Sequence, residues 1–215
     1  FEILIENYKM SMHNLAASGV YVICYNFMPI LDWTRTRLDM LMEDGSLALE
    51  FNSSELRVFD LCILKRKNAA DDYISEEISA AKLHFQNMSD EDIKRVSDNI
   101  LKGLPGSEEG YSIEEFTEML NTYAGIDADK LRSHLVQFLS EIIPVAEELG
   151  IRMCIHPDDP PFTLLGLPRI VSTMEDYQYI FDQVTPLSNG ITFCTGSLGV
   201  RADNDLPAIF TAFAD

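Results

Sequence analysis

Two stretches of the sequence end in side chains that commonly bind transition metals. Residues 151–156 read IRMCIH and residues 190–194 read GITFC, so an apolar run ends at His156 in one and at Cys194 in the other. An imidazole nitrogen and a thiolate at neighbouring strand ends could bind one divalent transition metal, such as Zn, Fe, Co or Mn. Such metals usually take three or more protein ligands, so these two residues do not complete a site.

Each of these ligand candidates also has an ordinary structural interpretation. A single cysteine in a strand is more often a small buried hydrophobic residue than a metal ligand. His156 precedes Pro-Asp-Asp and could be a loop residue hydrogen-bonded to Asp158 or Asp159. The same two aspartates could instead orient a metal-bound imidazole without binding the metal themselves, or they could form a solvated turn.

Three further polar residues are candidates for substrate contact. Asn26 ends an apolar run and could hydrogen-bond sugar hydroxyls, whereas Arg201 follows a later strand and could bind a carboxylate through two N–H groups. Asp158 is the third candidate. The competing interpretation for a loop arginine is a surface ion pair in a very acidic protein.

The candidate residues all follow segments that we expect to be parallel strands. We expect strands at 20–27, 151–156 and 191–195, and helices at 1–18, 52–66, 127–149, 172–184 and from 205 onward. A helix, a glycine, a strand and a loop occur in that order three times, which indicates a parallel sheet. The leading prediction is a (β/α)8 TIM barrel, because barrel active sites lie at the carboxyl ends of the strands.

A full barrel takes about 250 residues, and this chain of 215 also contains an acidic helical block. We therefore expect one partial barrel domain over 1–215, with residues 68–125 as a helical insertion or lid within it. The sequence leaves open whether that block is instead a contact between subunits. Loop and turn signals lie at 26–36 and at Asp44–Gly45.

Composition limits the possible partners. The formal net charge is −19, which argues against nucleic-acid binding and against an anionic membrane surface. No apolar run approaches the ~20 residues of a membrane span. The four cysteines include no CxxC pair, and three of them lie inside strand-like runs, which favours a reducing, cytoplasmic location.

Long blocks of the chain resemble the mannonate dehydratase family. The blocks are ICYNFMPILDWTRT from Ile23, MSDED from Met88, GLPGSEEGY from Gly103, IPVAEELGIRM from Ile143, HPDDPP from His156, LGLPRIVST from Leu165 and CTGSLGVRADNDL from Cys194. Together they extend over nearly the whole chain. The resemblance implies a xylose-isomerase-like TIM barrel that converts D-mannonate to 2-keto-3-deoxy-D-gluconate and water in glucuronate catabolism.

The resemblance also implies Fe2+ or Mn2+ held by a histidine, a cysteine, a second histidine and an aspartate. By the motifs, His156 and Cys194 fall on the first two ligands, and the other two, like the general acid and base, are expected beyond Asp215. The first barrel strands are expected before Phe1. On this interpretation the chain carries half of a metal site and is inactive alone, and no catalytic acid or base is assigned.

Two other functions remain open from the sequence. One is another metal-dependent sugar or sugar-acid isomerase on the same barrel, which product analysis would distinguish because an isomerase leaves the molecular formula unchanged. The other is an inactive fragment or metal-free binding protein, which the incomplete ligand set favours. Whether the chain forms a homo-oligomer is also left open.

Overall fold

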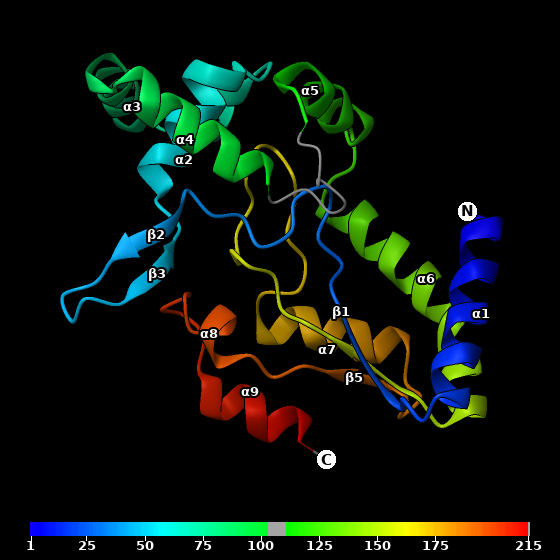
Figure 1. Ribbon diagram of the computed structural model, residues 1–215. Helices are drawn as coiled ribbons and strands as arrows, with labels where there is room; N and C mark the ends of the chain where they lie inside the picture. Colours follow the sequence, from blue (N-terminus) through cyan, green and yellow to red (C-terminus); the bar gives the residue numbers. More distant parts are fainter. Residues whose placement is uncertain (103–110, 215) are drawn as a thin grey trace. The chain divides into compact units, whose positions relative to one another are not determined.

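The computed structural model describes residues 1–102 and 111–214, and Figure 1 traces the chain through them. The GLPGSEEGY block therefore lies outside the described residues except for its last residue, Tyr111. The chain divides into two compact units. The sheet unit contains Phe1–Met28, Ile126–Phe162 and Pro168–Asp215, and the helical unit contains Pro29–Gly125 and Thr163–Leu167.

The sheet unit is built on a parallel sheet of three strands. These are β1 (Val22–Tyr25), β4 (Arg152–Ile155) and β5 (Asn189–Ile191), in the order β1-β4-β5. Both pairings are parallel, so the predicted parallel sheet is confirmed and the fold class is α/β.

The predicted strand 191–195 is wrong in its limits, because β5 ends at Ile191. The Thr192 N–H still donates to the Ile155 carbonyl at 2.8 Å, but the Cys194 N–H turns back onto the Thr192 carbonyl at 2.9 Å. The chain has therefore left the sheet before it reaches Cys194.

Helices pack against one face of this sheet. The helices of this unit are α1 (Glu2–Ala17), α6 (Ala128–Leu149), α7 (Met174–Gln183), α8 (Thr195–Leu198) and α9 (Leu206–Phe213). Asp127 caps α6 by accepting from the Lys130 N–H, and Gly150 ends it at φ 67°, a left-handed conformation that favours glycine. The predicted helix 127–149 is thus confirmed.

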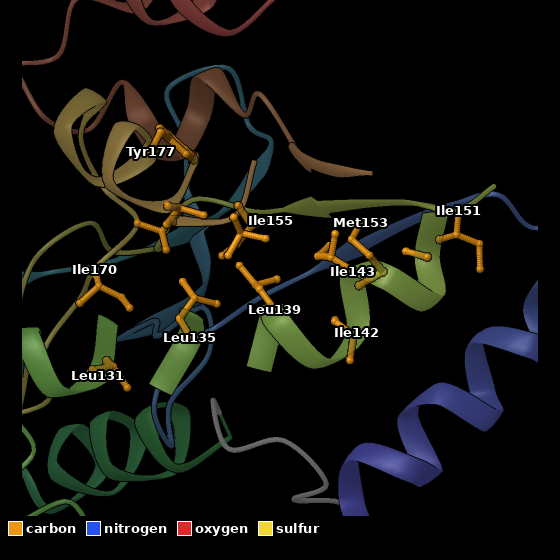
Figure 2. Close-up of a cluster of buried hydrophobic side chains, with 14 of the residues drawn as sticks. Leu131, Leu135, Leu139, Ile142, Ile143, Ile151, Met153, Ile155, Ile170 and Tyr177 are labelled. Atoms are coloured by element: carbon orange, nitrogen blue, oxygen red, sulfur yellow. The ribbon is translucent and has the colours of Figure 1, made fainter. Parts of the chain in front are cut away.

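The apolar stripe of α6 forms the core beneath β4. Leu139 and Ile143 of the helix and Met153 and Ile155 of the strand are fully buried in one cluster, and Figure 2 shows their side chains facing one another. Side chains of β4 alternate between the two faces of the sheet, so Met153 and Ile155 are buried on one face, whereas Arg152 is exposed and Cys154 is half-buried on the other. The core therefore fixes β4, the strand that leads into His156.

The helical unit contains the predicted acidic helices. Its elements are β2 (Arg37–Leu41), β3 (Leu47–Glu50), α2 (Ser53–Val58), the π-helix Phe59–Leu64, the 3-10 turn Ala69–Asp72, α3 (Ser75–Asn87), α4 (Asp90–Leu101) and α5 (Ile113–Thr122). Ser89 caps α4 by accepting from the Asp92 N–H, and Ser112 caps α5 by accepting from the Glu115 N–H.

Two features of this unit differ from the sequence prediction. The helix expected at 52–66 is capped by Asn52, but it changes to a π-helix after Val58. The antiparallel hairpin of β2 and β3 was missed, because the Asp44–Gly45 signal gave its turn but not its strands.

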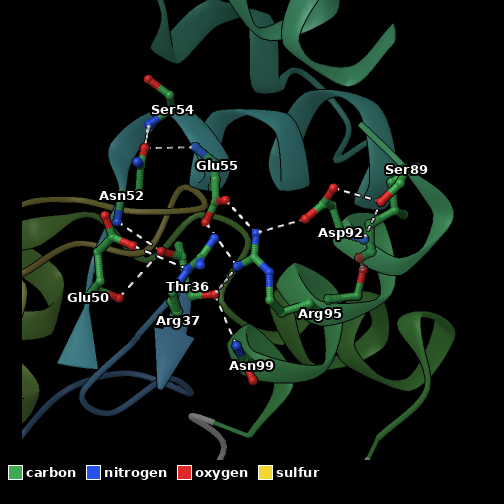
Figure 3. A network of polar contacts seen from close by, with 12 residues as sticks. Thr36, Arg37, Glu50, Asn52, Ser54, Glu55, Ser89, Asp92, Arg95 and Asn99 are labelled. Atoms are coloured by element: carbon green, nitrogen blue, oxygen red, sulfur yellow. Dashed lines mark hydrogen bonds and ion pairs between the residues drawn. The ribbon is translucent and has the colours of Figure 1, made fainter. Parts of the chain in front are cut away.

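Arg95 joins separate segments of the helical unit. Its guanidinium donates to Glu55 at 2.7 Å and to the Thr36 carbonyl at 3.0 Å, and Asn99 donates to the same carbonyl at 3.0 Å. Figure 3 shows these groups converging from α2, α4 and the start of the hairpin. The network anchors the end of the DWTRT segment within this unit. None of the helices that the structure describes is long and apolar enough to cross a membrane.

Candidate metal centre and its surroundings

His156 directly follows β4, and its backbone remains part of the sheet. The His156 N–H donates to the Tyr25 carbonyl at 2.8 Å, and the residue is 7% exposed. Its Nδ1 lies 2.7 Å from the Pro157 carbonyl oxygen. A carbonyl can only accept, so Nδ1 carries the proton and Nε2 carries the lone pair of the neutral ring. This is the tautomer that a histidine needs to bind a metal through Nε2.

Cys194 lies at the start of α8, where hydrogen-bond donors surround its sulfur. Partial burial raises the pKa of the Cys194 thiol, but hydrogen bonds from the Ser197 hydroxyl and from the backbone N–H groups of Ser197 and Gly196 outweigh it. The pKa of this thiol is therefore below its usual value, despite the opposing charge of Asp159. The thiolate is the form that binds metals, so this environment suits a ligand.

The sheet brings the candidate ligands to one end. Because β1, β4 and β5 are parallel neighbours, their carboxyl ends lie at the same edge of the sheet. Asn26 follows β1 and His156 follows β4 at this edge, and Cys194 lies three residues beyond β5. Within 1–102 and 111–214 there is no group of three or more His, Cys, Asp or Glu residues that could hold a metal ion. His156 and Cys194 therefore have no third such residue beside them in the part of the chain that the structure describes.

Asp158 is buried, with 1% of its surface exposed. Its Oδ2 accepts from the Val171 N–H at 2.7 Å and from the Ser172 hydroxyl at 3.0 Å. Burial raises the pKa of the Asp158 carboxyl, although the charge of Arg169 and these hydrogen bonds oppose the rise. Oδ1 is buried with no hydrogen-bond partner among the described residues. Asp158 therefore anchors residues 171–172 through one oxygen only.

Asp159 reaches a different segment. Its Oδ2 accepts from the Ser197 hydroxyl at 3.2 Å, and that hydroxyl lies 3.5 Å from the Cys194 sulfur. Ser197 was missed by the sequence analysis. The only available signal was its spacing of three residues from Cys194, at the start of a short helix.

Asn204 is a second residue that the sequence analysis missed. Its side-chain amide donates to the carbonyls of Ser172 and Leu198, both at 2.9 Å. It therefore ties the loop after α8 to the segment that Asp158 holds. No spacing in the sequence indicates this role, because the Asn204–Ser172 contact joins segments 32 residues apart.

Arg201 and Asn26 occupy different environments. The Arg201 guanidinium donates to the Asp203 carboxylate at 3.1 and 2.6 Å and to the Pro161 carbonyl at 3.2 Å. The structure therefore brings Arg201 to the HPDDPP loop through Nη1, while Nε and Nη2 donate to Asp203. Asn26 is exposed directly after β1.

The chain resembles known proteins over its full length. The sequence pattern of the D-mannonate dehydratase (UxuA) family matches residues 1–215. Mannonate dehydratases of a Marinomonas species and of Chromohalobacter salexigens are 55% and 49% identical over 94% and 98% of this chain. Those matches take in 52% and 54% of the relatives, so the chain spans about half the length of the curated relatives it matches.

A solved structure agrees with the sequence comparisons. The crystal structure of mannonate dehydratase from Streptococcus suis serotype 2 superimposes with a TM-score of 0.67 and 32% sequence identity. The match takes in 98% of this chain and 46% of that one.

Proposed function

Because this chain belongs to the D-mannonate dehydratase family, we propose that it carries part of an active site that removes water from D-mannonate. The products are 2-keto-3-deoxy-D-gluconate and water, so the enzyme is a hydro-lyase of hexuronate catabolism in the cytoplasm. The observation that carries the proposal is the placement of His156 and Cys194 beyond the carboxyl ends of neighbouring parallel strands.

We assign His156 Nε2 and the Cys194 thiolate as two ligands of Fe2+ or Mn2+. The hydrogen bond from His156 Nδ1 to the Pro157 carbonyl and the donors around the Cys194 sulfur support both assignments. Such a metal supplies a Lewis acid that stabilises the charge developing when the C2 proton of a sugar acid is removed. The remaining ligands, like the general acid and base, are proposed to lie outside the described residues.

Substrate contacts are proposed for Asn26, Arg201 and Asp158. Asn26 offers an amide at the same sheet edge as His156. Asp203 occupies the edge of the Arg201 guanidinium formed by Nε and Nη2, so a carboxylate that binds through this edge exchanges with Asp203. Asp158 can use Oδ1, the oxygen that has no partner among the described residues, to accept from a substrate hydroxyl.

We further propose that β1, β4 and β5 belong to a TIM barrel and that residues 68–125 are a helical insertion in it. The support is the parallel order of the strands, with α6 and α7 preceding β4 and β5. Cys24 and Arg152 are exposed on one face of this sheet. Parallel sheets in α/β proteins, TIM barrels included, are covered on both faces, so a barrel would cover this face as well.

The test measures bound metal and reaction products together. The tested protein contains these residues together with those proposed to supply the remaining ligands, the acid and the base. It is purified without oxygen and loaded with Fe2+ or Mn2+, and the metal per chain is measured by elemental analysis. Products formed from D-mannonate are identified by NMR. We expect a 2-keto-3-deoxy acid from the parent, and loss of both metal and product in His156→Ala and in Cys194→Ala.

Two control variants have matched chemistry. His13→Ala removes an exposed histidine of α1, and Cys62→Ala removes a half-buried cysteine of the helical unit. Both should keep metal and activity. A product with the formula of mannonate would indicate an isomerase instead, and a parent that neither binds metal nor forms product would refute the proposal.

A further inference from the structure

The Ser197 hydroxyl lies between two groups that can both accept a hydrogen bond from it. It is 3.2 Å from Asp159 Oδ2 and 3.5 Å from the Cys194 sulfur, and Ser197 is only 2% exposed. All three residues belong to the sheet unit. The contact with Asp159 joins loops that are 38 residues apart in the sequence.

A serine hydroxyl has one hydrogen to donate, which gives this contact two states. When Cys194 is a thiol, its S–H can donate to the Ser197 oxygen while the hydroxyl donates to Asp159. When Cys194 is a thiolate, it can only accept, so the hydroxyl must turn to the sulfur to remain bonded to it. The same oxygen therefore holds the sulfur in both protonation states.

The position of the sulfur depends on this contact because the backbone there is held only locally. The Cys194 N–H bonds to Thr192, two residues before it, and not to a neighbouring strand. Asp159 lies on the loop that begins with His156, so while Cys194 is a thiol the bond from Ser197 to Asp159 holds the cysteine loop to the histidine loop.

We propose that Ser197 is a positioning residue that holds the Cys194 sulfur for metal binding, and that Asp159 holds the Ser197 hydroxyl while Cys194 is still a thiol. The inference rests on the proposed metal site and adds two residues that act through Cys194 rather than on the substrate. Partners of this kind typically change metal affinity by about 10–100-fold when they are removed.

The test uses Co2+ as a spectroscopic probe in the same protein. A cobalt ion bound by a thiolate gives a sulfur-to-metal charge-transfer band, which reports the sulfur directly. In Ser197→Ala we expect cobalt affinity to fall about 10–100-fold and this band to weaken or shift. In Ser197→Thr, which keeps the hydroxyl, we expect affinity and band close to those of the parent.

Two more variants separate positioning from general damage. Asp159→Asn keeps an oxygen that accepts from Ser197, so we expect a smaller loss of affinity than in Ser197→Ala. Ser188→Ala removes a serine just before β5, at the opposite end of the strand, and should change neither readout. Circular dichroism confirms that each variant is folded before its affinity is compared.

A second readout does not need the metal. The rate at which iodoacetamide alkylates Cys194 in metal-free protein, followed by peptide mass spectrometry, should fall several-fold in Ser197→Ala because the thiolate loses a donor.

The possible outcomes distinguish the two proposals. Parent-like cobalt affinity, charge-transfer band and alkylation rate in folded Ser197→Ala would overturn the positioning role while leaving the metal site intact. A parent protein that binds no cobalt, or binds it without the charge-transfer band, would overturn the metal site and the positioning role together.

Discussion

Asp158 and Asp159 are adjacent in the sequence, yet their carboxylates hold two different segments of the sheet unit. Asp158 accepts from Val171 and Ser172, whereas Asp159 accepts from Ser197. One short loop after β4 therefore ties down both the segment before α7 and the segment after β5. This arrangement gives the HPDDPP motif a structural reason to carry two acidic residues in a row.

The first prediction concerns Asp158→Ala. This change removes the acceptor for the buried Val171 N–H and for the Ser172 hydroxyl, so we expect a loss of about 2–3 kcal/mol in the free energy of unfolding. Urea denaturation measures it. The control is Asp182→Ala on an exposed part of α7, which should stay within about 0.5 kcal/mol of the parent. Equal effects in the two variants would contradict the anchoring role.

Arg95→Ala tests the network of Figure 3. The change leaves Glu55, which is 7% exposed, without its guanidinium partner, and we expect a loss of about 2–4 kcal/mol. The neighbouring residue supplies the control. Lys94 pairs with Asp98 on the surface with 75% of its side chain exposed, so Lys94→Ala should cost less than about 0.5 kcal/mol. Thermal unfolding of both variants under one buffer decides the comparison.

Gly166→Ala tests a close contact in the helical unit. Gly166 has φ 74°, and a Cβ there would lie 2.8 Å from Nη1 of Arg66. The Nε and Nη2 atoms of the same guanidinium donate to buried Asp60, which limits how far it can move. Gly125 has φ 81° but nothing within 4 Å of its Cβ position. We expect Gly125→Ala to cost about 1–2 kcal/mol from backbone strain alone. Gly166→Ala should cost measurably more, and equal costs in urea denaturation would show that Arg66 moves freely.

The cap of α5 predicts a dependence on pH. The backbone N–H and hydroxyl of Ser112 lower the pKa of the Glu115 carboxyl from its usual 4.5. A pKa that is lower in the folded state contributes stability above the unfolded pKa and loses it as the pH falls through the folded pKa. The stability difference between the parent and Glu115→Gln should therefore be largest above about pH 4.5 and vanish in acid.

The neighbouring Glu114→Gln is the control for Glu115. It removes an exposed charge from the same first turn of α5 but leaves the capping box in place. Its stability difference from the parent should change less with pH than that of Glu115→Gln. Thermal unfolding between about pH 3 and 7 measures both stability differences. If they change with pH in the same way in the two variants, the role of the cap is contradicted.

The sequence predicted best those elements whose signals are local. The stripe of α6 and its caps at Asp127 and Gly150 lie within one continuous segment, and α6 was predicted nearly to its ends. The hairpin was missed because its stability depends on pairing between strands, including the ion pair of Arg37 with Glu50 at 3.6 Å. No single segment carries that information.

The same distinction applies to the candidate site. The positions of His156 and Asn26 after strands followed from apolar runs, and so did the parallel arrangement that brings them to one edge. The link from Asp159 to Ser197 could not be predicted, because two loops meet there only once the sheet has formed. The roles of the five predicted site residues remain predictions.

Because the chain leaves β5 before Cys194, the backbone hydrogen bonds at the two proposed ligands should open at different rates. The His156 amide is bonded to a strand of the central sheet, whereas the Cys194 amide is bonded within its own loop, next to the four residues of α8. Opening that loop breaks few hydrogen bonds, so the Cys194 amide should exchange with deuterium sooner than the His156 amide. If both residues hold a metal as proposed, the cysteine ligand would lie on the more easily opened of the two backbone segments.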